Sequence, residues 1–442
     1  MTRASVHRAT STPIGAPMRI RHYSTIVAVA ALSACGDSST APIDPSLSAG
    51  LAPALSSEGL GVFQRYVAIG TSISMGVQSD GVYSATQQTS WPAQLARLAH
   101  RELSLPLISF PGCAAPLASP LLTFVRLSGE GAGLDFLQRQ CMPNEPGVTL
   151  PAGNVAIDGA RTGQALTATP ENPDPGHATQ YPRVLAPGQS QVTAMEAQNP
   201  KIVSVELGGN DILGATHGFY LPGVNIVPVA FWEPQYREVA ARVDAAAKHA
   251  VLVGLVNDVR SFPSFRTGAE FWNARAAFLQ FNISVSANCE NSVNMLFVPY
   301  LLPRAIGTAA FYAGHGFGQY PLSCANQAAP AEDFILDPAD VAAVNAQLAA
   351  MNAVIQDEAR KRGFAYFPLG ALYEGVVAKP PFNPLAVMTS AQPYGPYISL
   401  DGIHPTAEGA RVIADAAATA LNATYHFGIP TSTGPLALFA NR

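Results

Sequence analysis

Four short apolar segments, separated by helical patterns, constrain the fold of this chain more than any other feature. The segments are residues 65–70, 201–207, 250–256 and 364–367. Each has the length of a buried strand. The apolar spacing between and after them predicts helices at residues 192–198, 236–249, 338–363 and 406–421. Strands that alternate with helices in this way predict an α/β fold whose parallel central sheet is covered on both faces.

Other stretches lack this regularity. Residues 104–190 are dense in proline and glycine, which is typical of loops. We expect one folded domain over residues 59–428, with loop-rich insertions near residues 104–150 and 260–332. A C-terminal tail at residues 429–442 follows it.

The N-terminal segment has the pattern of an export signal. Basic residues at 18–22 precede an apolar run at 26–32 that is too short to span a bilayer. The run ends at Cys35 in the string Leu-Ser-Ala-Cys, which resembles a bacterial lipobox. We expect a signal peptide at 1–34, a lipid on Cys35, a flexible tether at 35–58 and an exported lipoprotein of the cell envelope. An ordinary signal peptide is the alternative, and the pattern leaves open whether the outer or the cytoplasmic membrane holds the anchor.

Four cysteines remain besides the lipidated one. An even number in an exported protein suggests two disulfides. Proximity along the sequence favours the pairs Cys113–Cys141 and Cys289–Cys324, although three pairings are possible. A metal site is the weaker alternative, because the sequence has no CxxC spacing or nearby histidine pair.

Composition narrows the range of partners. Only 12% of the residues are charged, and the formal net charge is −5. Removing residues 1–34 takes away four arginines and no acid, which lowers the net charge to −9. An acidic chain offers no electrostatic footprint for nucleic acid, so we expect no nucleic-acid partner.

Two motifs contain a serine, an aspartate and a histidine next to predicted strand and helix ends. Gly70-Thr71-Ser72 directly follows the first predicted strand, where functional groups of parallel sheets collect. Asp401-Gly402-Ile403-His404 precedes the last predicted helix, and its spacing lets the carboxylate hold one ring nitrogen while the other acts as a base. Taken singly, the first motif is also a common helix cap and the second also suits a metal site or a cap. Together they make Ser72, His404 and Asp401 a candidate triad.

Two glycine-containing motifs supply candidate oxyanion donors. Asn210 lies in Gly208-Gly209-Asn210-Asp211, just after the second predicted strand, and its amide can donate to a developing oxyanion. Gly159 ends the segment Asn-Val-Ala-Ile-Asp-Gly, where glycine can expose a backbone N–H. The alternative for both motifs is an ordinary turn.

The four motifs, in this order, resemble those of the SGNH superfamily, also called GDSL esterases and lipases. The family's conserved Ser, Gly, Asn and His are matched here by Ser72, Gly159, Asn210 and His404. The resemblance covers roughly residues 64–424. It implies the SGNH hydrolase fold, a flavodoxin-like three-layer α/β/α arrangement with a parallel central sheet. Thr71 departs from the family, which has aspartate before the nucleophile.

The resemblance also implies acyl transfer through a covalent acyl-serine. His404 takes the proton of Ser72, which attacks an ester carbonyl, while Asp401 orients the imidazole. The oxyanion is held by the backbone N–H groups of Ser72 and Gly159 and by the Asn210 side chain. This chemistry needs no metal ion or organic cofactor. The implied substrate is a carboxylic ester, either a lipid or an acylated glycan.

Several features leave alternatives open. The apolar stretch 219–232 is expected to be core, with an acyl-binding groove or a lid as the alternative. Together with the membrane anchor it favours a lipid or medium-chain ester. Four histidines without metal-ligand spacing are expected at the surface or at helix ends: His100, His177, His217 and His249. Besides an ester hydrolase, an acyltransferase with the same acyl-serine and an inactive SGNH-like lipoprotein that binds envelope lipids or glycans remain possible.

Overall fold

The computed structural model describes residues 55–79, 81–113, 121, 141–377, 379–390 and 392–432. All of them belong to the unit Leu51–Arg442. Cys35, the predicted signal peptide and most of the predicted C-terminal tail lie outside the described residues. Among the residues that are described, no helix combines the length and the apolar character needed to cross a bilayer.

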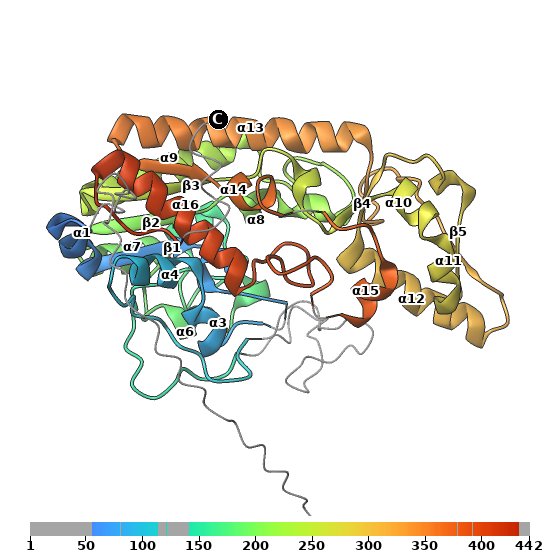
Figure 1. Cartoon of the computed structure of the whole chain (residues 1–442), viewed down its shortest axis with the longest axis horizontal. Helices are drawn as coiled ribbons and strands as arrows, with labels where there is room; N and C mark the ends of the chain where they lie inside the picture. Colours follow the sequence, from blue (N-terminus) through green and yellow to red (C-terminus); the bar gives the residue numbers. More distant parts are fainter. Residues whose placement is uncertain are drawn as a thin grey trace, which may run out of the picture. The chain divides into compact units, whose positions relative to one another are not determined.

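The central sheet confirms the predicted α/β fold. Its four parallel strands lie in the order β1 (Tyr66–Gly70), β2 (Ile202–Glu206), β3 (His249–Gly254) and β9 (Ala365–Pro368) (Figure 1). Residues 153–157 run parallel to the free edge of β1, where the Val155 N–H donates to the Ala68 carbonyl over 2.9 Å. The chain therefore extends the sheet to one side of β1 with this segment and to the other side with β2. That is a flavodoxin-like order with its switch point between β1 and β2.

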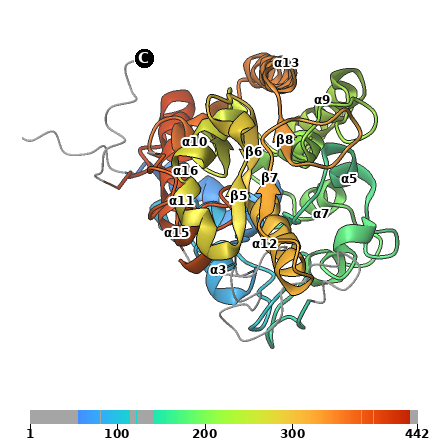
Figure 2. The ribbon, with the colours of Figure 1, turned by 90° about the vertical axis from the view of Figure 1, so that its right-hand side faces the viewer.

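Helices cover both faces of this sheet, which is why β1 and β2 are buried along their whole length (Figures 1 and 2). One face carries α4 (Trp91–Leu98) and α16 (Ala407–Tyr425). The other face carries α5 (Thr162–Thr167), α7 (Gln191–Ala197), α9 (Val229–Ala246) and α13 (Pro338–Arg362). Strands buried on both sides read as continuous apolar runs rather than alternating ones, as the four segments of this sequence do.

Helix α9 corrects one sequence-based boundary. The sequence predicts a helix from residue 236, after Pro234, whereas the helix begins at Val229 and contains that proline. Proline removes one helical hydrogen bond. Trp232 and Tyr236 on either side of it are fully buried and stack with ring centroids 4.9 Å apart. Burial of these two large rings offsets the lost bond.

The predicted tether also ends earlier than expected. Helix α1 (Ser57–Val62) begins inside the predicted tether, and the Ser56 hydroxyl caps it by accepting from the Gly59 N–H over 3.0 Å. The Ser56 N–H donates to the carbonyl of Phe427 over 2.7 Å. This hydrogen bond attaches the segment to the residues that directly follow helix α16.

Residues 265–336 form small elements of their own at one end of the sheet (Figure 2). A three-stranded antiparallel sheet has the order β4 (Phe265–Thr267), β6 (Met295–Phe297), β8 (Ile335–Leu336), and β5 (Ile283–Val285) pairs in parallel with β7 (Tyr320–Leu322). The helices here are α10 (Gly268–Asn273), α11 (Arg275–Phe278) and α12 (Val298–Gly314). The stretch that the sequence predicts as a loop-rich insertion thus contains regular structure.

Both disulfides have the predicted pairing. Cys113 bonds to Cys141, and Cys289 bonds to Cys324. The second bridge connects the segment after β5 to the segment after β7.

The remaining elements are short. The other helices are α2 (Ser72–Met75), α3 (Ser84–Gln88), α6 (Tyr181–Val184), α8 (Gly209–Ile212), α14 (Gly370–Tyr373) and α15 (Pro384–Thr389). Turns of 3₁₀ helix span Phe63–Arg65, Pro175–His177, Leu213–His217, Val259–Ser261, Leu279–Phe281 and Ala287–Cys289. Helices α2 and α8 begin at the ends of the neighbouring strands β1 and β2, so they bring Ser72 and Asn210 to the same edge of the sheet.

Candidate active site

Ser72 lies at the first position of helix α2, directly beyond the end of β1. The turn between strand and helix is tight. A Cβ atom on Gly70 would lie 2.5 Å from the Ser74 hydroxyl, so a side chain at this position would not fit. The predicted alternative, a capping role for Ser72, does not match this placement, because Thr71 occupies the N-cap position.

A buried carboxylate explains the threonine that departs from the family pattern. Glu206, at the end of β2, accepts from the Thr71 N–H over 3.0 Å and from the Thr71 hydroxyl over 2.8 Å. It also accepts from the Ser74 hydroxyl over 3.0 Å. Burial raises the pKa of Glu206. An aspartate at position 71 would place a second carboxylate against it, whereas threonine adds a hydroxyl donor to the backbone N–H. Glu206 is not among the residues predicted from the sequence, although an acid that ends an apolar strand is a signal.

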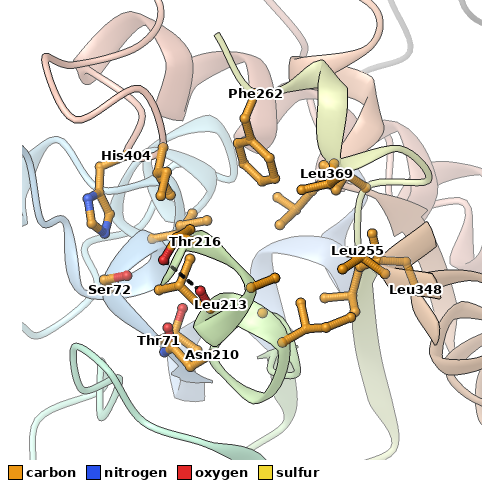
Figure 3. A pocket seen from close by; sticks show the side chains of 18 of the residues that line it. Thr71, Ser72, Asn210, Leu213, Thr216, Leu255, Phe262, Leu348, Leu369 and His404 are labelled. Atoms are coloured by element: carbon orange, nitrogen blue, oxygen red, sulfur yellow. Dashed lines mark hydrogen bonds between the residues drawn. The ribbon is translucent and has the colours of Figure 1, made fainter. Parts of the chain in front are cut away.

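His404 and Asp401 form the second part of the predicted triad. The Nδ1 atom of His404 lies 2.7 Å from Oδ2 of Asp401. The other oxygen of Asp401 accepts from the backbone N–H groups of Ile403 and His404 over 2.9 and 2.8 Å. Since Asp401 holds Nδ1, the other ring nitrogen is free to face the nucleophile. Figure 3 shows the His404 ring and the Ser72 hydroxyl facing each other.

Three carboxylates govern the protonation of His404. Burial alone would lower its pKa, but the charge and hydrogen bond of Asp401 outweigh burial, and the pKa is raised from its usual value. The charges of Asp158 and Glu206 act in the same direction. The imidazole is therefore a stronger base than a free histidine, which suits a group that must take a proton from serine.

The two predicted oxyanion donors lie in neighbouring segments, Gly159 in a turn and Asn210 in a short helix. Gly159 is the third residue of a turn closed by a 3.2 Å hydrogen bond from the Ala160 N–H to the Ile157 carbonyl. Its φ of +73° matches a type II turn, which favours glycine at that position. Asn210 lies in the short helix α8, and its amide nitrogen donates to the Ala160 carbonyl over 3.1 Å. The structure thus brings Asn210 against the turn that contains Gly159.

Asp211, in helix α8, bonds to the start of helix α5, which follows the turn that contains Gly159. One of its oxygens accepts from the N–H and the hydroxyl of Thr162 over 3.0 and 2.8 Å. The Trp232 indole N–H donates to the same hydroxyl over 2.8 Å. Burial raises the pKa of Asp211 to about 6. Asp211 therefore joins helix α8 to the first residue of helix α5.

Comparison with known proteins identifies the family of this chain. Residues 66–417 match the family described as GDSL-like lipase/acylhydrolase. The chain belongs to this family. Among solved structures it is similar to Axe2, an acetylxylan esterase from Geobacillus stearothermophilus, with 13% identity, a TM-score of 0.31 and coverage of 79% of this chain and 90% of that one. No curated protein matches the sequence significantly.

Two further solved structures have similar values. The extracellular lipase from Streptomyces rimosus has 16% identity, a TM-score of 0.30 and coverage of 81% of this chain and 98% of that chain. Phospholipase A1 from Streptomyces albidoflavus has 14% identity, a TM-score of 0.26 and the same coverage.

An apolar pocket opens beside Ser72 and His404. Figure 3 shows Leu255 and Leu348 at the end of the pocket away from Ser72, with Phe262 and Leu369 between. The apolar lining residues are Ile73, Ile212, Leu213, Ala215, Leu255, Val256, Val259, Phe262, Phe265, Val344, Leu348, Leu369 and Ile403. The polar side chains among its lining residues include Ser72, Asn210, Thr216 and His404.

A second, polar cleft also opens at the same serine. Ser72, Asn210 and His404 line it together with further acids, bases and amides. These further polar residues are Asp158, Arg161, Gln164, Asp174, His177, Thr216, His217, Tyr300 and Asp401. In the part of the chain that the structure describes, no cluster of His, Cys, Asp and Glu is arranged to hold a metal ion.

Two expectations from the sequence can now be compared with the structure. The apolar stretch 219–232 contributes Phe219, Ile226 and Trp232 to the core, as the first of its two interpretations predicts, and it lines neither cavity. His177 is expected at the surface or a helix end, and it does end the 3₁₀ turn Pro175–His177. Its side chain is nevertheless only 12% exposed, and it lines the polar cleft. Neither placement has a signal in the local sequence, because each depends on which distant segment packs against it.

Proposed function

We propose that this protein is a serine carboxylic-ester hydrolase, an esterase or lipase, that works through an acyl-serine intermediate on Ser72. One observation carries the proposal. The 2.7 Å contact between Asp401 and His404 holds the imidazole beside Ser72, where an apolar pocket and a polar cleft meet. Such a constellation is recognised by geometry and roles rather than by sequence position.

The proposed reaction proceeds in two steps. His404 takes the proton of the Ser72 hydroxyl as its oxygen attacks the ester carbonyl, and the oxyanion accepts from the N–H groups of Ser72 and Gly159 and from the Asn210 amide. His404 then protonates the departing alcohol. In the second step it takes a proton from water, which attacks the acyl-serine. His404 then returns this proton to the departing Ser72 oxygen as the acid is released.

The two cavities suggest how an ester lies in the site. The acyl chain occupies the apolar pocket, since burying each methylene group contributes about 0.8 kcal/mol. The alcohol then lies in the polar cleft, where Asp158, Asp174 and Arg161 offer partners for hydroxyl groups. We therefore propose a medium-chain or lipid ester rather than an acetyl ester as the substrate.

A series of nitrophenyl esters from acetyl to dodecanoyl tests both the acyl-serine mechanism and the proposed acyl pocket, with the Ser72→Ala variant as control. We expect kcat/KM to be highest at medium chain length and to vanish in the variant. Activity confined to acetyl esters would contradict the acyl pocket, and activity that survives in Ser72→Ala would contradict the acyl-serine. Product analysis with added glycerol separates hydrolysis from transfer to an alcohol.

We also propose that the protein is a lipoprotein of the bacterial cell envelope, anchored through Cys35. Its support is the basic and apolar N-terminal pattern that ends in Leu-Ser-Ala-Cys. Labelling cells with radioactive palmitate tests this directly. Label should enter the full chain and be lost in the Cys35→Ala variant, whereas equal labelling of both would refute the assignment.

A further inference from the structure

His177 lies directly on the turn that contains Gly159. If Gly159 carried a Cβ atom, that atom would lie 2.1 Å from Cε1 of the His177 ring and 2.5 Å from its Nδ1. The ring therefore occupies the space over this glycine. The turn has a glycine for two reasons, its positive φ and the ring packed on it.

Two carboxylates fix the ring in this place. Nδ1 of His177 lies 3.0 Å from Oδ2 of Asp174, and Nε2 lies 3.7 Å from Oδ2 of Asp158. The amide nitrogen of Gln164, on helix α5, donates to the other oxygen of Asp174 over 2.9 Å. The amide nitrogen of Gln180 donates to Asp158 over 3.2 Å. The hydrogen bond with His177 holds the pKa of Asp174 below its usual range.

The peptide between Asp158 and Gly159 is the part of this turn that needs restraint. Hydrogen bonds hold its outer residues, since the Ile157 N–H donates to the Gly70 carbonyl over 3.1 Å and Asn210 donates to Ala160. Type I and type II turns differ by a rotation of the central peptide, which reverses the direction of its N–H. Glycine permits both forms. A ring that touches Gly159 and faces the Asp158 carboxylate favours one of them.

We propose that His177 is a positioning residue that fixes the peptide between Asp158 and Gly159, and thereby the direction of the N–H that Gly159 offers to the oxyanion. This inference rests on the proposed function. His177 takes no part in proton transfer. It acts through the oxyanion, so its loss weakens binding of the transition state more than binding of the substrate.

Three substitutions test this role. His177→Ala removes the ring, His177→Gln keeps an amide near the position of Nε2 and towards Asp158, and His177→Asn keeps one near Nδ1 and towards Asp174. His315→Ala is the matched control, because that histidine is exposed at the end of α12 and bonds to the Phe311 carbonyl. Melting temperatures identify variants that no longer fold, and the Gln and Asn pair carries the test if the Ala variant does not fold.

The readouts separate positioning from a general structural role. For His177→Ala we expect kcat on a medium-chain ester to fall about 10- to 100-fold, below the roughly 10²–10³-fold cost of losing a whole oxyanion donor. KM should stay within about twofold, because ground-state binding is unchanged. The inhibition constant of butylboronic acid, which forms a tetrahedral adduct with serine, should rise by the same factor as kcat/KM falls. His177→Gln should retain more activity than His177→Asn, and His315→Ala should match the parent.

Other outcomes overturn the inference. Unchanged kcat and boronate inhibition in folded His177 variants would exclude the positioning role, and a rise in KM alone would make His177 a substrate contact instead. Equal activity of the Gln and Asn variants would also contradict it. Failure of the proposed function looks different, because Ser72→Ala would then keep its esterase activity.

Discussion

The apolar pocket and the polar cleft, which form the two sides of the site at Ser72, are lined largely by different parts of the fold. The apolar pocket is lined by the residues that follow β3, by helix α13 and by the turn Val259–Ser261. Leu255 after β3 and Val344 and Leu348 of α13 are buried. The polar cleft is lined by loops before and after α5 and by the start of α12. Core elements thus supply shape on one side, and loops supply hydrogen-bonding groups on the other. Substitutions on the two sides should therefore change different kinetic properties.

The largest effect belongs to the point where the two sides meet. Ser72→Ala should lower kcat on every ester by on the order of 10⁴-fold or more, because the nucleophile is lost for all substrates alike. Steady-state hydrolysis of short and medium-chain nitrophenyl esters measures this. A loss restricted to one chain length would place the nucleophile elsewhere.

A substitution at the oxyanion donor should reduce rate without changing chain-length preference. Asn210→Ala should lower kcat roughly 10²–10³-fold, since the amide stabilises charge that develops in the transition state. The ratio of octanoyl to acetyl activity should stay as in the parent. A changed ratio would mean that Asn210 shapes the acyl pocket, and the distinction between the two sides would fail at this residue.

A substitution deep in the apolar pocket should instead change the chain-length preference and leave the rate on acetyl esters unchanged. Leu348→Trp fills the end of the pocket away from Ser72 (Figure 3), so activity on octanoyl esters should fall by about 10- to 100-fold, the scale on which methylene fit discriminates substrates. Acetyl ester activity should remain. Leu348→Ala is the opposite control and should extend the preference to longer chains. Parallel loss of acetyl and octanoyl activity in a folded variant would rule out this pocket as the acyl site.

The smallest effect concerns pH. His404 must be neutral to act as a base, so kcat/KM falls as the pH drops through its pKa, which lies above the usual histidine value. Asp158, on the polar side, contributes to this rise through its charge, after Asp401. Asp158→Asn should therefore move the acidic limb of the pH profile to lower pH, and Leu348→Ala should leave it in place. An unmoved limb in Asp158→Asn would show that its charge does not act on His404.

Local patterns in the sequence were sufficient for several features of this site. Ser72 follows a strand, and Asp401 lies three residues before His404, so their backbones alone bring each motif into place. The cysteine pairs could be ordered by proximity, and the structure confirms that pairing. Boundaries were less accurate where buried rings outweighed a local signal, as in helix α9, which contains Pro234.

Contacts between segments far apart in the chain could not be predicted from the sequence. Glu206 bonds to Thr71 across two neighbouring strands, and the sequence contains no spacing that would pair them. The same holds for His177, whose partner turn lies on another loop. The stretch 219–232 had the composition of either a core or a groove, since both need apolar side chains.

Strand length, helix caps and residue spacing are local properties, so the amino-acid sequence was enough to predict the parallel α/β fold and the order of the four motifs. It favoured the disulfide pairs that the structure shows but left three pairings possible. The surroundings of Ser72 depend instead on tertiary packing. Packing assigns Leu348 and Leu255 to an apolar pocket and His177 to the turn of Gly159. It brings together residues far apart in the chain, and the free energy of those contacts depends on the folded arrangement rather than on neighbours in sequence.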